Sequence, residues 1–242
     1  MLGALGDDDA GKYLRRVADD AGVDMSAVAT LAGQPTGRAV ITVGDDTGEN
    51  TIVVVPGANS AVHVDVVPNG RVVLAQLEVP LDAVVTAFVA AKQRGAITIL
   101  NPAPATELPT ELLAVTDVVV PNEHEIGLIG GVEALLDLGV STVIVTRGAS
   151  GVEVSNAGHR SPTAYAALAV EPIDTTGAGD AFNSGFAVAL AEGRDLVDAV
   201  RFGVVCGGIA CTKLGVIPGL PARAEADAFY REALETVWKD AT

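Results

Sequence analysis

Apolar residues along the chain follow the two periods of regular secondary structure in turn. Short runs rich in valine and isoleucine predict strands, and stretches with apolar residues three or four positions apart predict helices. We expect strands at residues 72–77, 96–100, 115–120, 143–146 and 166–170. We expect helices at residues 9–21, 81–94, 132–138, 178–190, 196–211 and 224–238.

Continuous apolar strands that are separated by helices indicate an α/β fold, in which a parallel sheet is covered on both faces. One segment breaks this rhythm. The β-branched runs Arg38–Val43 and Thr51–Val55 flank a Gly/Asp/Asn-rich loop at residues 44–50, a pattern typical of a hairpin. We therefore expect one α/β domain, residues 1–35 and 57–242, with residues 36–56 as a β-hairpin lid.

Composition narrows the possible partners and the compartment. The 242 residues carry 15 Lys and Arg against 31 Asp and Glu, a net charge of −16, which argues against a nucleic-acid surface. Hydrophobic residues make up 49%, so a packed core is expected. We find neither a membrane-span pattern nor a secretory-leader pattern, and expect a cytoplasmic protein. Cys206 and Cys211 are expected to be buried thiols, with metal ligation as the alternative.

The stretch from Pro172 to Phe186, PIDTTGAGDAFNSGF, carries the most specific chemistry. It precedes an expected helix, and Gly177 and Gly179 allow a tight turn and a ligand's close approach to the backbone. Free N–H groups at a helix N-terminus suit phosphate oxygens. Asp180 in the same turn would repel a phosphate, but it could accept the proton of a hydroxyl that attacks that phosphate. The alternative is that Asp180 is only a favourable helix-terminal charge.

This stretch closely resembles the signature of the ribokinase family of sugar kinases, in which Asp-Thr-x-Gly-Ala-Gly-Asp-x-Phe precedes a helix of small residues. Further segments, in the family's order, extend the resemblance from about Gly6 to the C-terminus. They are GAN at 57–59, QLEVP at 76–80, NPAPA at 101–105, ELP at 107–109, PNEHE at 121–125, TRGASG at 146–151 and KLGV at 213–216. The resemblance implies a ribokinase-like three-layer α/β/α fold with a mostly parallel sheet and a small β lid.

The resemblance also implies a reaction, the transfer of the γ-phosphoryl group of ATP to a sugar. The NPAPA segment favours D-ribose, phosphorylated at its 5-hydroxyl. Asp180 would be the general base, and the amides of Gly177, Ala178 and Gly179 would form the anion hole. Glu78 would bind sugar hydroxyls at the carboxyl end of a strand, where open α/β sheets place ligands. A solvated carboxylate is the alternative for Glu78.

Nucleotide and magnesium contacts are implied after the later strands. Asn122 would contact nucleotide phosphates, and Glu125 would act on Mg²⁺ through water, which suits an ion that keeps several waters. The same residues fit a helix cap with a helpful acidic side chain, and both can hold at once. The other implied nucleotide contacts are Thr146, Arg147, Gly148, Ala149, Ser150, Gly151, Gly179 and Val204. We expect His124 to be solvated rather than a metal ligand.

A monovalent cation, usually potassium, is implied beside the anion hole. Its ligands would be the Asp174 carboxylate and the carbonyls of Thr176, Ala210, Lys213 and Gly215, with Gly219 as a further backbone donor. From the residues alone, 215–219 is equally an ordinary loop. The resemblance further implies a homodimer, because lids of this family pair between subunits and exposed β surface favours a partner.

The sequence departs from the family at its N-terminus. The family begins with a further strand bearing a sugar-binding Asp and a Gly-Gly-Lys-Gly-Ala-Asn-like segment, whereas Met1–Asp8 resembles the segment just downstream of both. The connections near 63–71 and 127–139 are also shorter than the family's. We therefore expect a truncated relative that lacks part of its sugar contacts. Three functions stay open: an active D-ribose kinase, a catalytically impaired nucleotide-binding relative, and a same-family kinase for another sugar or nucleoside.

Overall fold

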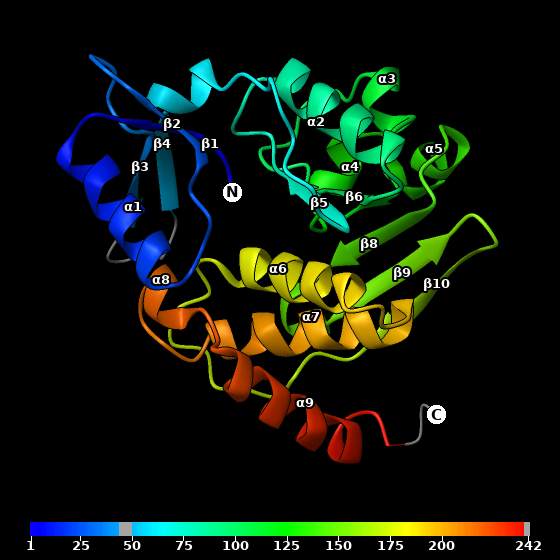
Figure 1. The fold of residues 1–242 in the computed structure, drawn as a ribbon. Helices are drawn as coiled ribbons and strands as arrows, with labels where there is room; N and C mark the ends of the chain where they lie inside the picture. The colour runs from blue at the N-terminus through cyan, green and yellow to red at the C-terminus, as the bar shows by residue number, and fades with distance from the viewer. Residues whose placement is uncertain (44–49, 240–242) are drawn as a thin grey trace. The chain divides into compact units, whose positions relative to one another are not determined.

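The computed structural model describes residues 1–43 and 50–239, which divide into two compact units (Figure 1). The first unit comprises Met1–Asn69 and Leu77–Ala90, and the second comprises Gly70–Gln76 and the chain from Ala91 onward. Among the described helices, none combines the length and the apolar character that a membrane span requires.

A six-stranded sheet forms the centre of the second unit. Its strand order is β10-β9-β8-β7-β6-β5. The strands are β5 (Val72–Ala75), β6 (Ile97–Leu100), β7 (Val118–Val119), β8 (Thr142–Thr146), β9 (Val152–Asn156) and β10 (His159–Tyr165). β5 to β8 are parallel, while β9 and β10 are antiparallel. The predicted mostly parallel sheet is confirmed, and the carboxyl ends of β5 to β8 share one edge.

In the second unit one predicted strand is wrong, and two strands of its sheet, β9 and β10, were not predicted; the strands Leu2–Gly6 and Ala27–Leu31 of the first unit were not predicted either. Residues 166–170 form no strand; the partly buried Leu168 packs against the helical core instead of a sheet neighbour. The alanines around it are weak strand formers, whereas the residues before them form the β9–β10 hairpin. The alternation of valine with polar residues along Val152–Asn156, followed by a short Ala-Gly turn, is the sequence signal that predicts this hairpin.

Helices cover both faces of this sheet. Neighbouring residues of β7 and β8 point to opposite faces, so Val119 and Val143 join one core cluster and Val118 and Ile144 join the other. Short helices α3 (Thr110–Leu113), α4 (Glu125–Leu128) and α5 (Gly131–Asp137) supply the first cluster or flank it. Helices α6 (Ala178–Ala191), α7 (Leu196–Ala210) and α9 (Arg223–Thr236) supply the second, and the short α8 (Val216–Gly219) precedes α9. The predicted three-layer α/β/α arrangement is confirmed within this unit.

α6 and α7 lie side by side and approach closely at small residues (Figure 1). A Cβ atom on Gly185 would lie 2.5 Å from the Cys206 Sγ, and one on Gly203 would lie 3.0 Å from the Phe182 ring. Cys206 is therefore buried, as predicted, and desolvation raises its pKa to about 11. Cys211 is only partly buried, so the prediction of two buried thiols holds fully for one of them.

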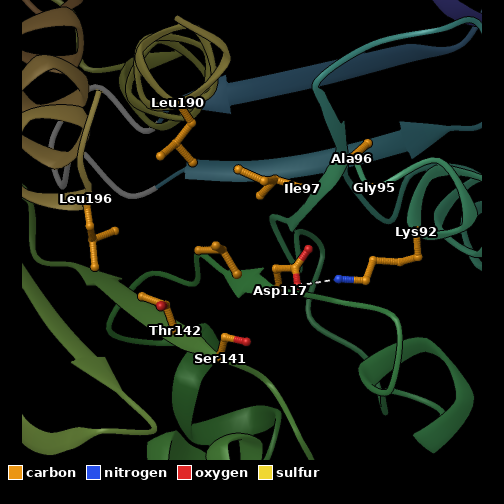
Figure 2. Close-up of a pocket in the computed structure, with 10 residues that line it drawn as sticks. Lys92, Gly95, Ala96, Ile97, Asp117, Ser141, Thr142, Leu190 and Leu196 are labelled. Carbon is orange, nitrogen blue, oxygen red and sulfur yellow. Dashed lines mark hydrogen bonds and ion pairs between the residues drawn. The ribbon is translucent and has the colours of Figure 1, made fainter. Parts of the chain in front are cut away.

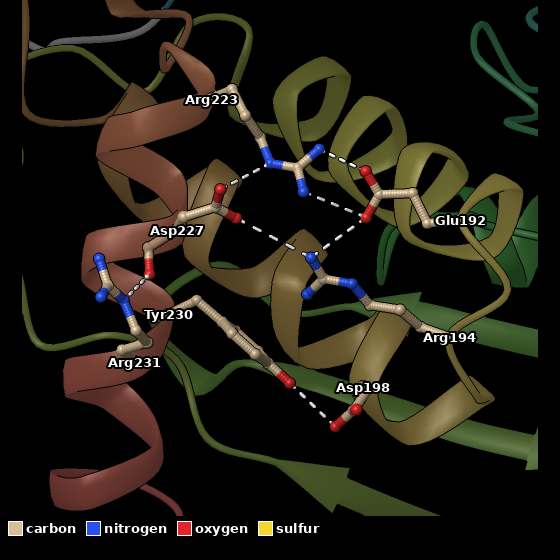
Figure 3. Close-up of polar contacts among 7 residues, drawn as sticks. All are labelled: Glu192, Arg194, Asp198, Arg223, Asp227, Tyr230 and Arg231. Carbon is tan, nitrogen blue, oxygen red and sulfur yellow. Dashed lines mark hydrogen bonds and ion pairs between the residues drawn. The ribbon is translucent and has the colours of Figure 1, made fainter.

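An ion-pair network fastens α9 to the turn between α6 and α7 (Figure 3). Arg223 pairs with Glu192 and, at 2.8 Å, with Asp227, and Arg194 reaches Glu192 at 3.2 Å. The Arg194 guanidinium also lies 4.4 Å from the centre of the Phe202 ring. The Tyr230 hydroxyl donates to Asp198 at 2.9 Å. These contacts hold the C-terminal helix against the α6–α7 pair.

The first unit contains a parallel pair and an antiparallel pair of strands. β1 (Leu2–Gly6) pairs with β2 (Ala27–Leu31), and β3 (Arg38–Val43) pairs with β4 (Asn50–Val55). The predicted hairpin strands are thus present. Of the loop predicted at residues 44–50, Asn50 begins β4 and residues 44–49 lie outside the described residues. Helices α1 (Asp9–Asp20), η1 (Gly57–Ala61) and most of α2 (Leu81–Gln93) complete the unit. The role of residues 36–56 as a lid stays a prediction.

The Asp8 carboxylate forms hydrogen bonds with three parts of this unit: the first turn of α1, Thr36 and the start of β3. It caps α1 by accepting from the Gly11 amide at 2.9 Å, and it accepts from both the hydroxyl and the amide of Thr36. Arg38 at the start of β3 donates to it at 3.0 Å. These hydrogen bonds, the Thr36 hydroxyl foremost, hold the pKa of Asp8 well below its usual range.

Replacing this carboxylate should destabilise the protein. We expect Asp8→Ala to lower the melting temperature at pH 7, and Asp9→Ala, an exposed neighbour with one long ion pair to Lys12, to leave it nearly unchanged. Because the folded pKa is lowered, the difference between wild type and Asp8→Ala should shrink as pH falls below about 4. Thermal unfolding from pH 7 to pH 2 measures this, and equal melting temperatures for wild type and Asp8→Ala at pH 7 would contradict it.

Candidate active site

A cavity of about 190 Å³ opens at the carboxyl edge of the parallel strands. Residues that follow the strands line one side, and the first turns of α6 line the other. The lining residues are Asn101, Ala103, Val120, Asn122, Glu125, Thr146, Gly177, Gly179, Asp180 and Asn183. Open α/β sheets bind ligands at this edge. The structure thus brings together six residues predicted from sequence, which are Asn122, Glu125, Thr146, Gly177, Gly179 and Asp180.

The start of α6 is shaped by glycine. Gly177 caps the helix with a φ of +80°, a left-handed conformation that a side chain would strain. The Ala178 amide already donates to the Thr175 carbonyl at 3.2 Å. The first N–H groups of a helix have no partner within it. Of the three predicted anion donors, the Gly177 and Gly179 amides are therefore better candidates than the Ala178 amide.

Gly179 faces open space. A Cβ atom built on it would meet no atom within 4 Å, and its backbone is not left-handed. Packing therefore does not explain the glycine at this position. Because the residue lines the cavity, a side chain there would occupy space that a ligand needs to reach the helix amides.

Asp180 occupies the third position of α6 and is exposed to the cavity. Its Oδ1 accepts a hydrogen bond of 3.4 Å from the Gln76 side-chain amide, which follows β5. This contact leaves Oδ2 available to a hydroxyl group. Gln76 was not among the predicted site residues, because the sequence pattern places it inside the predicted strand 72–77, whereas β5 ends at Ala75.

Asn122 and Glu125 cap each other. The Asn122 Oδ1 accepts from the amides of His124 and Glu125 at 2.9 and 2.8 Å, and a Glu125 oxygen accepts from the Asn122 amide at 2.8 Å. This reciprocal arrangement is the predicted cap. Glu125 is partly buried, and desolvation raises its pKa. A carboxylate in that position is stabilised by a cation or by strong hydrogen-bond donors.

Of the other predicted nucleotide residues, Thr146 lines the cavity, whereas residues 147–151 and Val204 are not among its lining residues. Thr146 ends β8 and bridges to Asn122, while Gly148–Ser150 form the short turn η2 beyond it. Arg147 is ion-paired with Glu153 at 2.9 Å. Val204 is buried in the helical core. The proposed nucleotide contacts of residues 147–151 and Val204 stay predictions.

The predicted cation ligands lie in the segment before α6, at the end of α7, in the turn that follows it and at the end of α8. The two Asp174 oxygens accept from the amides of Thr176 and Gly215, both at 2.9 Å. Hydrogen bonds, first from the Thr176 side chain and then from these amides, lower the pKa of Asp174 and keep it ionised. The Ala210 carbonyl lies beside Gly219, where a Cβ would come within 2.9 Å of it. Lys213 pairs through its side chain with Glu225, which leaves its carbonyl role a prediction.

Two further predicted residues, Glu78 and His124, are not among those that line the cavity. Glu78 belongs to the first unit and is exposed, and its sugar-binding role stays a prediction. His124 is exposed, as expected for a solvated side chain.

A larger cavity, of about 380 Å³, lies at the opposite edge of the sheet, where β6, β7 and β8 begin (Figure 2). Lys92 and Asp117 pair there at 2.6 Å, beside Ile97, Leu190 and Leu196. The Asp117 carboxylate also accepts from the amide and hydroxyl of Thr98. Lys92 and Asp117 are therefore paired within the protein. The predicted site residues Asn122, Glu125 and Asp180 lie instead at the carboxyl edge of the sheet.

Comparison with known proteins identifies the family. A model of the pfkB family carbohydrate kinases matches residues 1–223. The chain belongs to this family. Among curated pfkB-type relatives, the ribokinase of Haemophilus influenzae is 39% identical over 76% of this chain and 66% of its own length. The ribokinase of Staphylococcus aureus is 36% identical over 74% of this chain and 65% of its own length. The chain thus spans about two thirds of the length of these relatives.

A solved structure shares the pfkB fold. The Arabidopsis thaliana ribokinase, in a complex with ribose and ATP, superposes with a TM-score of 0.88 and 30% identity over 95% of this chain and 81% of that protein. The alignment with the H. influenzae relative has 204 positions, which is more than the 76% of this chain that it covers. Some residues of that relative therefore have no counterpart in this chain.

The open space at Gly179 leads to a prediction for this pfkB site. We expect Gly179→Ala to raise the melting temperature, because alanine favours a helix by up to about 1 kcal/mol over glycine. If substrate phosphates bind at this turn, it should nevertheless lower turnover by about 10²-fold, because a methyl group would keep them from the helix amides. Gly127→Ala, the same change in α4 with open space around it, is the control. Unchanged turnover in Gly179→Ala would show that the phosphoryl group does not approach this turn.

Proposed function

We propose that the protein transfers the γ-phosphoryl group of ATP to the 5-hydroxyl of D-ribose. The observation that carries the proposal is the cavity that places Asp180 beside the glycine-rich N-terminus of α6. The named relatives are ribokinases, and the Arabidopsis protein binds ribose and ATP, which supports the choice of substrates.

In this proposal Asp180 is the general base. The Gln76 amide holds one of its oxygens, and the other accepts the proton of the attacking hydroxyl. The new bond forms between the hydroxyl oxygen and the γ-phosphorus, and the bond from that phosphorus to the bridging oxygen breaks to release ADP. The amides at the start of α6 neutralise the charge on the transferred group.

The cavity also fits Mg²⁺. Its wall offers oxygen atoms, and the Glu125 carboxylate is desolvated without an ion pair among the described residues. Oxygen donors and retained waters are what this ion prefers. Glu125 would hold the ion through water, Asn122 would contact the nucleotide phosphates, and a bound ion would neutralise phosphate charge. Asp174, which hydrogen bonds keep ionised, would hold K⁺ together with backbone carbonyls of the neighbouring residues.

Two alternatives share the fold. A same-family kinase for another sugar or a nucleoside would keep Asp180 and α6 but differ in the residues that hold the acceptor. A nucleotide-binding relative without turnover would bind ATP and release no ADP. The first is separated by a panel of acceptors, and the second by comparing ATP binding with ADP release.

The role of Asp180 can be tested by removing its charge. We expect Asp180→Asn to lower ribose-dependent ADP release by about 10²–10⁴-fold, because the amide accepts no proton from the sugar. Binding of ADP, measured by calorimetry, should stay within about twofold of wild type. Glu171→Gln, the loss of an exposed carboxylate outside the cavity, is the control for charge alone. Normal turnover in Asp180→Asn would rule out this residue as the base.

We also propose that the protein pairs through its hairpin. Val40 and Val53 are opposite each other in the β3–β4 register, lie on the same face of the hairpin and are 57% and 56% exposed. An apolar two-stranded surface of this kind favours a second copy of the same chain.

Light scattering at micromolar concentration tests the pairing. We expect a dimer for the wild type and a monomer for Val53→Lys, because a charge on each copy opposes burial of this surface. Val66→Lys, at a valine that is 70% exposed and lies outside the hairpin, should stay dimeric. A monomeric wild type would contradict the proposal.

A further inference from the structure

Asn183 is buried, polar and unpartnered. It lies one turn beyond Asp180 on α6, only 2% of its surface is exposed, and it lines the active-site cavity. Its side-chain oxygen Oδ1 has no hydrogen-bond partner among the described residues. Leaving such an atom unpaired destabilises a protein, so its retention calls for a partner that arrives with a ligand.

The surroundings of Asn183 are rich in acceptors. The Asn101 side-chain amide donates one of its two N–H groups to the Val120 carbonyl at 2.8 Å. Glu125 contributes a desolvated carboxylate that accepts one hydrogen bond, from the Asn122 amide. Free backbone donors lie at the first turn of α6. The cavity therefore offers donors at the start of this helix, and acceptors at the Asn183 Oδ1 one turn further along it and at the Glu125 carboxylate.

The donors and the acceptors of the cavity suit different parts of a ligand. Phosphate oxygens carry no proton to donate at neutral pH once a nucleotide is ionised, so they suit the α6 amides and not Asn183. Waters bound to Mg²⁺ are strong donors, and the ion keeps several of them in proteins. A phosphate chain could thus bind the α6 amides while a hydrated cation beside it donates to Asn183.

We propose that Asn183 accepts a hydrogen bond from a water ligand of the Mg²⁺ ion that accompanies the nucleotide. It acts as a positioning residue, since it orients the metal's hydration shell and touches neither the phosphoryl group nor the base. The inference rests on the proposed function, because it requires a nucleotide with its phosphates at the start of α6.

Asn183→Leu separates this role from a structural one. Leucine has a similar size and removes the unpaired oxygen, so the ligand-free protein should melt about 2–4 °C higher than wild type. The tightening of ADP binding by Mg²⁺, measured by calorimetry with and without the ion, should fall by about tenfold, the loss expected for a hydrogen bond to a charged centre. ADP binding without Mg²⁺ should not change.

Two further variants sharpen the comparison. Ser184→Leu introduces the same side chain at the next, exposed position of α6 and should leave the effect of Mg²⁺ intact. Asn183→Asp keeps an acceptor oxygen at the same distance from the backbone and should retain most of that effect.

The outcomes are distinguishable. If the wild type binds ADP neither with nor without Mg²⁺, the proposed function is wrong and this inference is wrong with it. If the wild type shows the Mg²⁺ effect and Asn183→Leu shows it equally, only the inference fails. A lower melting temperature in Asn183→Leu, or a weaker affinity for D-ribose with the Mg²⁺ effect unchanged, would also overturn it, because Asn183 would then serve the fold or the sugar.

Discussion

The site depends on how firmly the N-terminus of α6 is held at the edge where the parallel strands end. The helix is anchored by Phe182 and Phe186, whose rings stack 6.2 Å apart in the core beneath the sheet. Close contact with α7 at Gly185 fixes its axis. Because Asp180 and the first helix amides are part of the same rigid element, their mutual geometry does not depend on any loop closing over them.

This anchoring explains why polar groups that weaken the fold persist in the cavity. Glu125 is desolvated, Asn183 keeps an unpaired oxygen, and Gly179 replaces a better helix former. Each would be improved for stability by a simple substitution. Functional sites commonly retain such local conflicts, and their concentration in one cavity is stronger support for that site than any one of them. The larger cavity at the other sheet edge shows no such conflict around its satisfied Lys92–Asp117 pair.

Most of the fold could be predicted from periodicity. The long helices and the buried parallel strands are signalled by patterns that span many residues, and they are present. The segment 166–170 was misjudged because short apolar runs do not distinguish a strand from a chain that packs one leucine on a helix. Asp180, Asn122 and Glu125 could be predicted because they belong to recognisable motifs. Asn183 and Gln76 could not, because their importance lies in burial and in a contact across 104 positions of sequence.

The central claim is that this cavity transfers a phosphoryl group to a sugar. The most direct measurement is ADP release by the wild-type chain with ATP, Mg²⁺ and K⁺, in the presence and absence of D-ribose. The account predicts release that depends on ribose and saturates with it. Equal release with and without ribose, under conditions in which ATP raises the melting temperature, would contradict it and leave a nucleotide-binding protein without this activity.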